Sequence, residues 1–226
     1  MAARAQAMQQ RGASRSRAAL RQEQLFEQLV HDLRNPLGAI AYYAEAVPGA
    51  TAGERDELCE RLRVNGQRAL QVLEEFSLLA DLRAGRSQPA LEPCDPGELI
   101  DALAADLEAM ERRPGLIRRR VEGRSPPCLP RVHLVRTLRA LLRELARATA
   151  PGEALEVAVR CEGGDVRFEL SVPLRGVPEL GVVAKLPTTG IEIELAERVA
   201  ALYGGRCTVE RGSGGGLVTV RLPAVA

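Results

Sequence analysis

The amino-acid sequence predicts an α plus α/β protein, in which a helical hairpin precedes an α/β sandwich. In the first third of the chain, apolar residues recur every three or four positions, which is the period of one helical stripe. Beyond residue 90, strand-like and helix-like segments are interleaved without a regular βαβ alternation. This order favours one mixed sheet that helices cover on one face.

Residues 18–84 are expected to form the hairpin. Its first helix should run from about Ala18 to Val47, and Thr51-Ala-Gly-Glu has the spacing of a capping box, so a second helix should span about 52–83. The hairpin could bury its apolar stripe in a four-helix bundle with a second copy, or against its own C-terminal domain. For contacts between copies or with a partner, the first helix should expose apolar residues that include Leu29, Leu33 and Leu37.

The remaining chain is predicted to hold a linker and a second domain. An Arg- and Gln-rich extension covers residues 1–17, the linker covers 85–90, and the second domain covers 91–226. Its helices should lie near Pro96–Glu111, Arg131–Thr149 and Ile191–Tyr203. Its strands should lie near Leu116–Val121, Ala154–Cys161, Val166–Val172, Arg206–Arg211 and Leu217–Leu222. The last two strands should form a hairpin through Gly212–Gly216.

Composition excludes several functional classes. Lys and Arg total 31 against 30 for Asp and Glu, so no overall charge attracts nucleic acid or anionic lipid. The 5 cysteines are scattered without a Cys-x-x-Cys pair, which indicates neither a zinc site nor a disulfide framework. No apolar run approaches the length of a membrane span, and we therefore expect a soluble, cytoplasmic protein.

The heptapeptide His31–Leu37, with the sequence His-Asp-Leu-Arg-Asn-Pro-Leu, is the most distinctive segment. On a helix, His31 points away from the apolar stripe and shares an exposed side with Arg34 and Asn35. A neutral imidazole nitrogen is a nucleophile near neutral pH. Asp32 can accept a hydrogen bond from the other ring nitrogen, and Arg34 can balance phosphoryl charge. This combination favours a phosphoryl acceptor over a solvated surface histidine.

The heptapeptide is similar to the histidine box of bacterial sensor histidine kinases, which usually reads His-Glu-Leu-Arg-Asn/Thr-Pro-Leu. The resemblance implies that residues 18–84 are a dimerisation and histidine-phosphotransfer domain, with His31 phosphorylated. It also implies that Asp32 and Asn35 can orient a water that dephosphorylates a response regulator. The predicted catalytic residues are therefore His31, Asp32, Arg34 and Asn35.

The segment from Gly190 to Pro223 resembles the C-terminal part of the ATP-binding domain of these kinases, a histidine-kinase-type ATPase-like α/β sandwich. The nucleotide-binding residues of that family are absent at the aligned positions. Its asparagine box, which holds Mg²⁺, aligns with Ala140 and Glu144. In its Asp-x-Gly-x-Gly box, Val172 replaces the aspartate that receives the adenine amino group, and a valine cannot accept that hydrogen bond. The two glycines of that box align with Leu174 and Gly176.

The glycine box of the family is also changed. The aligned residues, 188–193, keep only the middle glycine, Gly190, and place Glu192 where a phosphate would bind. Residues 179–187 are too few for the usual nucleotide lid. The resemblance therefore implies a degenerate site that holds neither nucleotide nor metal. If the second domain is instead an unrelated α/β module, ATP binding is equally unexpected.

These observations predict a histidine phosphotransferase of a two-component phosphorelay, and not an ATP-dependent kinase. His31 of a homodimer would exchange a phosphoryl group with receiver-domain aspartates, including that of a hybrid histidine kinase, and the receiver would supply Mg²⁺. No cofactor of its own, nucleic acid or membrane span is expected. The alternatives are a non-catalytic pseudokinase scaffold or inhibitor that binds a response regulator or kinase, a response-regulator phosphatase, and a kinase with an unusual ATP pocket.

Overall fold

The computed structural model describes residues 23, 26–87, 90–123, 128–173, 190–212 and 215–223. The chain divides into two compact units, Met1–Phe76 and Ser77–Ala226. The boundary lies inside a continuous helix, α2 (Ala52–Arg83), so the last two turns of that helix belong to the second unit. Within the described ranges, no helix combines the length and apolar character needed to cross a bilayer.

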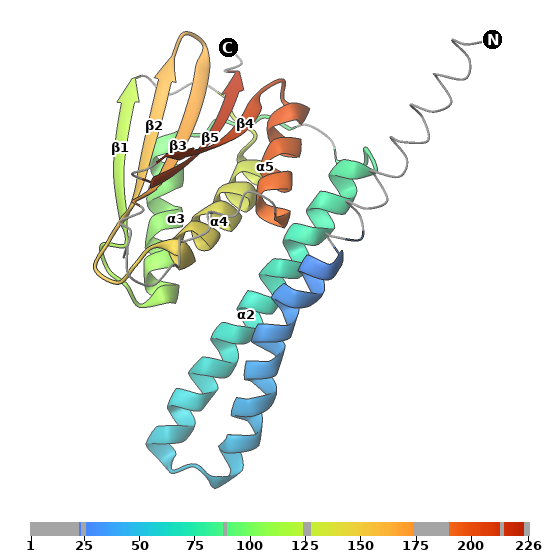
Figure 1. Ribbon diagram of the computed structural model, residues 1–226, viewed down its shortest axis with the longest axis vertical. Helices are drawn as coiled ribbons and strands as arrows, with labels where there is room; N and C mark the ends of the chain where they lie inside the picture. The colour runs from blue at the N-terminus through green and yellow to red at the C-terminus, as the bar shows by residue number, and fades with distance from the viewer. Residues whose placement is uncertain are drawn as a thin grey trace, which may run out of the picture. The chain divides into compact units, whose positions relative to one another are not determined.

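The first unit is a helical hairpin, and Figure 1 shows its two helices side by side. Residues 26–46 are helical, the short 3-10 helix η1 (Val47–Gly49) makes the turn, and α2 follows. The predicted capping residues meet, because the hydroxyl and the N–H of Thr51 both donate to Glu54 Oε2, at 2.6 and 2.9 Å. These two bonds lower the pKa of the Glu54 carboxyl. The predicted start of the second helix is thereby confirmed.

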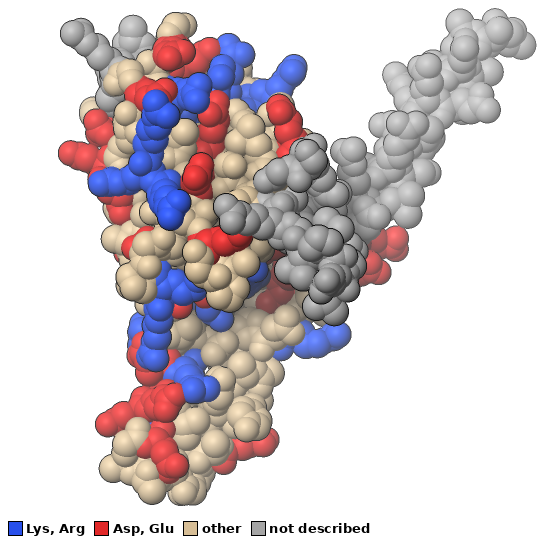
Figure 2. Space-filling view, turned by 60° about the vertical axis from the view of Figure 1, so that its left-hand side comes forward, with Lys and Arg blue, Asp and Glu red and all other residues tan. Residues whose placement is uncertain are grey.

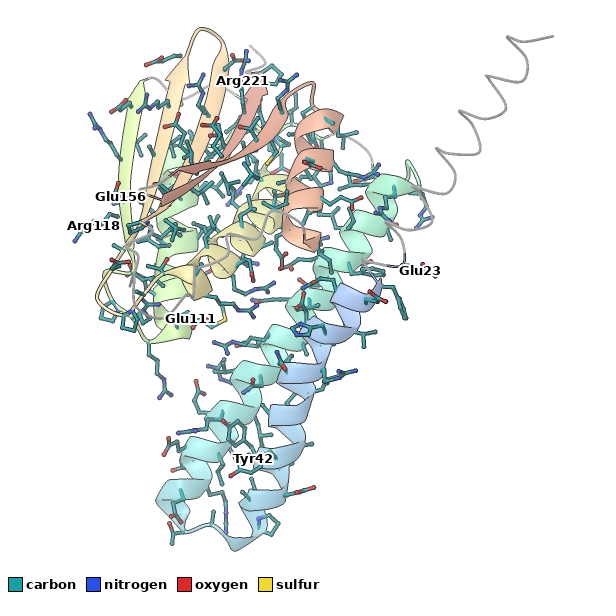
Figure 3. The ribbon with its side chains drawn as sticks, viewed as in Figure 1. Glu23, Tyr42, Glu111, Arg118, Glu156 and Arg221 are labelled. Atoms are coloured by element: carbon teal, nitrogen blue, oxygen red, sulfur yellow. The ribbon has the colours of Figure 1, made fainter. Side chains whose placement is uncertain are left out.

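Apolar side chains remain exposed on both helices of the hairpin. Leu37 is 52% exposed, as expected, and Leu33 is half-buried. The expectation that Leu29 is exposed was wrong, because only 7% of it reaches solvent and it lies on the covered side of its helix. Tyr42, labelled in Figure 3, is 69% exposed. Among the described residues of this unit, the exposed large apolar side chains are those of Phe26, Val30, Leu37, Tyr42, Leu70 and Leu73.

The described part of the second unit contains a 5-stranded sheet in the order β1-β2-β3-β5-β4. Its strands are β1 (Ile117–Gly123), β2 (Leu155–Glu162), β3 (Asp165–Pro173), β4 (Arg206–Gly212) and β5 (Gly215–Pro223). β1 and β2 are parallel, and the other neighbours are antiparallel. The helices α3 (Pro96–Glu111), α4 (Arg131–Ala148) and α5 (Ile191–Leu202) lie on one side of the sheet in Figure 1. The predicted fold class is confirmed.

Each element follows from its local sequence. The Asp95 carboxylate caps α3 by accepting from the N–H groups of Gly97 and Glu98, at 2.7 and 3.0 Å, and Pro96 starts the helix. β4 and β5 pair as far as Gly212 and Gly215, so their connection is shorter than the predicted 212–216. Glycines in an extended conformation can continue the hydrogen bonding between two strands, so a glycine-rich composition predicted too long a loop.

The core lies between the sheet and its three covering helices. Val166, Phe168, Leu170 and Val172 are fully buried at alternate positions of β3, which is the period of a strand with one covered face. Each such side chain stabilises the fold by about 1.5–3 kcal/mol. Leucines of α3 and α4 fill the space above them.

The opposite face of the sheet carries charged side chains. Arg118 of β1 lies beside Glu156 of β2 in the register, and Figure 3 shows both at the same end of the sheet. Arg221 of β5 donates to Asp165 of β3, with 2.8 Å between Nε and Oδ2. Figure 2 shows basic and acidic side chains interspersed over this unit. The pattern is that of a sheet face in contact with water.

A polar network joins three segments of the second unit around His133 of α4. Ser87 Oγ lies 2.8 Å from His133 Nε2, and the Tyr203 hydroxyl lies 2.6 Å from His133 Nδ1. The same hydroxyl accepts from the N–H of Ala90 at 3.3 Å. The segment after α2 is thereby fastened to α4 and to the end of α5. Burial, followed by the charge of Arg136, lowers the pKa of His133.

This pKa shift predicts a stability that depends on pH. Because the folded pKa of His133 lies below its unfolded value of about 6.5, its neutral form stabilises the fold above that pH, and the contribution is lost as pH falls through the folded pKa. One proton changes the free energy of unfolding by at most about 1.4 kcal/mol per pH unit. Urea unfolding at about pH 7.5 and about pH 5 should show a larger loss in the wild type than in His133→Gln. Equal losses would contradict this role of His133.

Candidate functional site

The predicted catalytic residues lie together on the first helix of the hairpin. The side chain of His31 is 68% exposed, so the imidazole is open to a partner from solution. Arg34 and Asn35, one helical turn later, are exposed as well. Asp32 is largely covered, with 15% of its side chain exposed. The helix thus presents the ring, a cation and an amide to solvent and keeps the carboxylate largely covered beside them.

The imidazole contacts Asp32 through one of its nitrogens. His31 Nδ1 lies 3.2 Å from Asp32 Oδ1. In the tautomer whose Nδ1–H donates to this carboxylate, the lone pair is on Nε2. Within the described residues, Nε2 has no hydrogen-bond partner. The arrangement can therefore present a nucleophilic nitrogen to solvent while the other side of the ring is held.

Gln28 is a member of this site that we did not predict from the sequence. Its side-chain Nε2 lies 3.0 Å from Asp32 Oδ1 and 3.0 Å from Asp32 Oδ2. The amide therefore donates to the same carboxylate that faces the histidine ring. The signal was present in the sequence, because a glutamine four residues before an aspartate on a helix is a known hydrogen-bonding pair.

The residues aligned with nucleotide-binding positions lie in the second unit. Ala140 is fully buried on α4, and Glu144 on the same helix accepts from Arg147 at 3.1 Å. Val172 is fully buried in β3, where it belongs to the core. Leu174 and Gly176 lie outside the described residues, as do residues 179–189. Each described position therefore has a structural role in this unit.

Glu192 lies in the first turn of α5 and is 5% exposed. Its Oε1 lies 3.9 Å from Nη2 of Arg143 on α4, and the Arg143 side chain is 2% exposed. A Cβ atom at position 190 would lie 2.8 Å from Glu192 Oε2, so the carboxylate packs against Gly190. The backbone of Gly190 is extended, with φ −171°, and needs no glycine for its conformation. At the N-terminus of α5, the position that the resemblance aligns with the glycine box, the chain's own Glu192 carboxylate packs against the backbone.

Sequence reasoning placed Glu192 but missed its partner. Arg143 follows two leucines on α4 and falls on the side that meets α5, which no local pattern in α4 reveals. The two predicted groups of residues, around His31 and around Glu192, belong to different compact units.

The cysteines and the other potential metal ligands do not indicate a second reactive site among the described residues. The 5 cysteines, Cys59, Cys94, Cys128, Cys161 and Cys207, are free. Burial, assisted by Glu197, raises the pKa of the Cys207 thiol to about 12, so this sulfur is a poor nucleophile. Over the described ranges, no group of 3 or more His, Cys, Asp or Glu side chains could hold a metal ion.

Comparison with known proteins identifies the hairpin. Residues 21–85 match the family model described as the His Kinase A (phospho-acceptor) domain, and this range contains His31. No curated protein matches the chain by sequence.

Solved structures resemble the chain over both units. The histidine kinase AdeS of Acinetobacter baumannii is 12% identical, with a TM-score of 0.61 over 87% of this chain and 98% of that one. ThkA, solved in complex with the response regulator TrrA, is 16% identical, with a TM-score of 0.54 over 93% of this chain and 64% of that one. Full-length ShkA, solved with AMPPNP, is 22% identical, with a TM-score of 0.52 over 90% of this chain and 46% of that one.

At these identities the structural likeness shows the fold alone, and the family model assigns the hairpin. Residues 21–85 therefore match the His Kinase A (phospho-acceptor) domain, and the chain as a whole, hairpin followed by α/β domain, has the fold seen in solved histidine kinases.

Proposed function

We propose that this chain is a histidine phosphotransferase of a two-component phosphorelay, in which His31 receives and donates a phosphoryl group without ATP. The proposal rests on two observations: the histidine ring is exposed, and the aligned nucleotide position at the start of α5 is occupied by the chain's own side chains. His31 is 68% exposed with Nε2 unpartnered in the described part of the chain, whereas Glu192 and Arg143 fill the start of α5. The phospho-acceptor hairpin itself supports a role in two-component signalling.

The proposed chemistry needs no nucleotide. The lone pair of His31 Nε2 attacks the phosphorus of a receiver's aspartyl phosphate, the P–O bond to the aspartate breaks, and its carboxylate leaves. The new P–N bond is that of a phosphoramidate, which can pass the group to another receiver aspartate. Mg²⁺ would be held by the receiver's acidic residues, and Arg34 would lie near the phosphoryl charge. Asp32 would accept from Nδ1–H while positive charge develops on the ring.

The second unit supports independence from ATP. A nucleotide would need a hydrogen-bond acceptor at position 172, where a fully buried valine stands. It would also need to bring phosphate to the N-terminus of α5, where the Glu192 carboxylate lies. Like charges in a buried site repel strongly, so this carboxylate opposes a phosphate.

The partners follow from the surface of the hairpin. Exposed leucines on α2, at positions 70 and 73, and exposed apolar residues of the first helix supply an area that a second copy can cover. The resulting homodimer would present two His31 rings. Receiver domains are the proposed phosphoryl partners, as ThkA was solved with the response regulator TrrA. Because receivers act inside the cell, we propose a cytoplasmic location.

Phosphotransfer profiling tests the function directly. The purified full chain, incubated with each phosphorylated receiver domain of its host, should lose the receiver's label and acquire an acid-labile label on His31. His31→Ala should abolish the label. Incubation with ATP and Mg²⁺ alone should leave the chain unlabelled. Absence of label on His31 with every receiver would exclude a phosphotransferase.

Two outcomes of the same experiment separate the alternatives. A scaffold or inhibitor would keep its effect on the partner in His31→Ala. A phosphatase would release phosphate to water in His31→Ala but not in Asn35→Ala. Label from ATP would instead indicate a working kinase.

The buried ion pair between Arg143 and Glu192 predicts that replacing the Glu192 carboxylate by an amide lowers the stability of the fold. Glu192→Gln leaves the Arg143 guanidinium buried with a weakened partner, and it should lower the free energy of unfolding by about 3 kcal/mol, the lower end for such pairs because 3.9 Å is long. Urea unfolding measures the loss. Glu197→Gln, on the exposed side of the same helix, is the matched control and should change stability little. Equal stability of the two variants would contradict the pair.

The proposed dimer predicts a change in mass. Leu70→Arg combined with Leu73→Arg places charge on the exposed stripe, and the loss of about 1.5–3 kcal/mol for each leucine in two copies should raise the dimer Kd at least about ten-thousandfold. Analytical ultracentrifugation should find a species of 24.4 kDa in place of one twice that mass. Val132→Arg, at a 52% exposed valine of the other unit, should remain dimeric. A wild-type monomer would refute the dimer.

A further inference from the structure

We infer that Gln28 is a positioning residue for the phosphoryl acceptor, because its amide holds the Asp32 carboxylate against Nδ1 of His31. The inference rests on the proposed role of His31 as the acceptor, and it adds a residue that acts on the ring through Asp32. Three polar groups on two successive turns of one helix carry it.

Adjacent residues of a helix do not face each other. His31 and Asp32 are about 100° apart around the axis, so their side chains must turn toward one another to meet. Their distance of 3.2 Å is at the long end for an N–H···O bond. The ring is 68% exposed, and water competes for the same carboxylate oxygen. Some third group has to hold the carboxylate if the contact is to persist.

Gln28 provides that group. It lies one helical turn before Asp32, on the same side of the helix, and its Nε2 is 3.0 Å from both carboxylate oxygens. A donor that contacts both oxygens fixes the plane of the carboxylate as well as its direction. Oδ1 is then shared by Gln28 and His31. Because Gln28 and Asp32 are both partly covered, this bond is better protected from water than the bond to the ring.

The consequence concerns the protonation of the ring. A carboxylate held at Nδ1 favours the tautomer with hydrogen on Nδ1 and the lone pair on Nε2, whereas free histidine in water prefers hydrogen on Nε2. When Nε2 forms a bond to phosphorus, the leaving group departs with the P–X electron pair, and the Nδ1 proton stays on the ring. The resulting cationic ring donates to Asp32. Gln28 thus acts through Asp32 on how often Nε2 is ready to attack.

An ordinary helix-surface pair would behave differently. It would add a little helix stability and leave the ring unaffected. A measurement of the protonation of the His31 ring therefore distinguishes a positioning role from an ordinary surface pair. A variant that removes another glutamine of the hairpin serves as the control. The control is Gln67 of α2, which belongs to the same unit. Its side chain accepts a hydrogen bond from Arg63 at 3.0 Å and has no assigned role at His31.

The test uses the full-length chain and two readouts. ¹⁵N NMR measures the fraction of His31 with hydrogen on Nδ1, and its signals among the 2 histidines are identified by their loss in His31→Ala. Potassium phosphoramidate, a small phosphoryl donor that releases ammonia, measures the rate of ring phosphorylation without any receiver. Gln28→Ala should lower the Nδ1–H fraction and slow phosphorylation by about two- to tenfold, the effect of one hydrogen bond. Gln28→Glu would place a second carboxylate against that of Asp32, and the repulsion should lower the Nδ1–H fraction and the phosphorylation rate further.

The outcomes distinguish this inference from the proposed function. Unchanged Nδ1–H fractions in Gln28→Ala and Gln28→Glu would overturn the positioning role, even if receivers label His31. Equal effects of Gln67→Ala would overturn it too, since they would indicate a general loss of the hairpin. A tautomer shift in the Gln28 variants would support the role, even if no receiver transferred its phosphoryl group.

Discussion

The sheet buries only one of its two faces, and this constraint decides where the helices of the second unit lie. β3 supplies fully buried side chains at alternate positions, so α3, α4 and α5 must cover the same side. α4 and α5 then pack side by side, and residues far apart in the chain meet between them. Arg143 reaches Glu192, and His133 reaches Tyr203. The first of these contacts lies at the start of α5, which the resemblance aligns with the glycine box.

The acceptor site depends on a different constraint, the turn of a single helix. Gln28, His31 and Asp32 are brought together by spacings of one to four residues, and no distant segment is needed. Such a site can form wherever the hairpin forms. Its chemistry is therefore separable from the nucleotide-aligned positions of the second unit, where Val172 and Glu192 lie among core and ion-pair contacts.

The features that the sequence predicted depend on neighbouring residues, and those it did not predict depend on contacts between distant segments. Periodicity and capping residues predicted α2 and α3 closely, because both signals are local to the helix, and the exposure of His31 followed from the same period. The partner of Glu192 was not predictable, because it depends on which faces of α4 and α5 meet. Leu29 was misjudged because a stripe shows which residues are apolar, and not which of them the other parts of the chain cover. The catalytic roles of Arg34 and Asn35 stay predictions.

The proposed loss of nucleotide-binding residues is compatible with an intact fold for an energetic reason. A buried carboxylate at position 172 would need compensating hydrogen bonds, whereas the valine there adds apolar contact to the core. At the start of α5, a glutamate near the helix N-terminus is stabilised by the helix dipole and by the Arg143 charge. Under the proposed function the phosphoryl group comes from a receiver, so these positions would not have to bind ATP. The replacements can then stabilise the domain while the exposed His31 keeps its proposed chemistry, and the proposal thereby accounts for an ATPase-like fold that would no longer need a nucleotide.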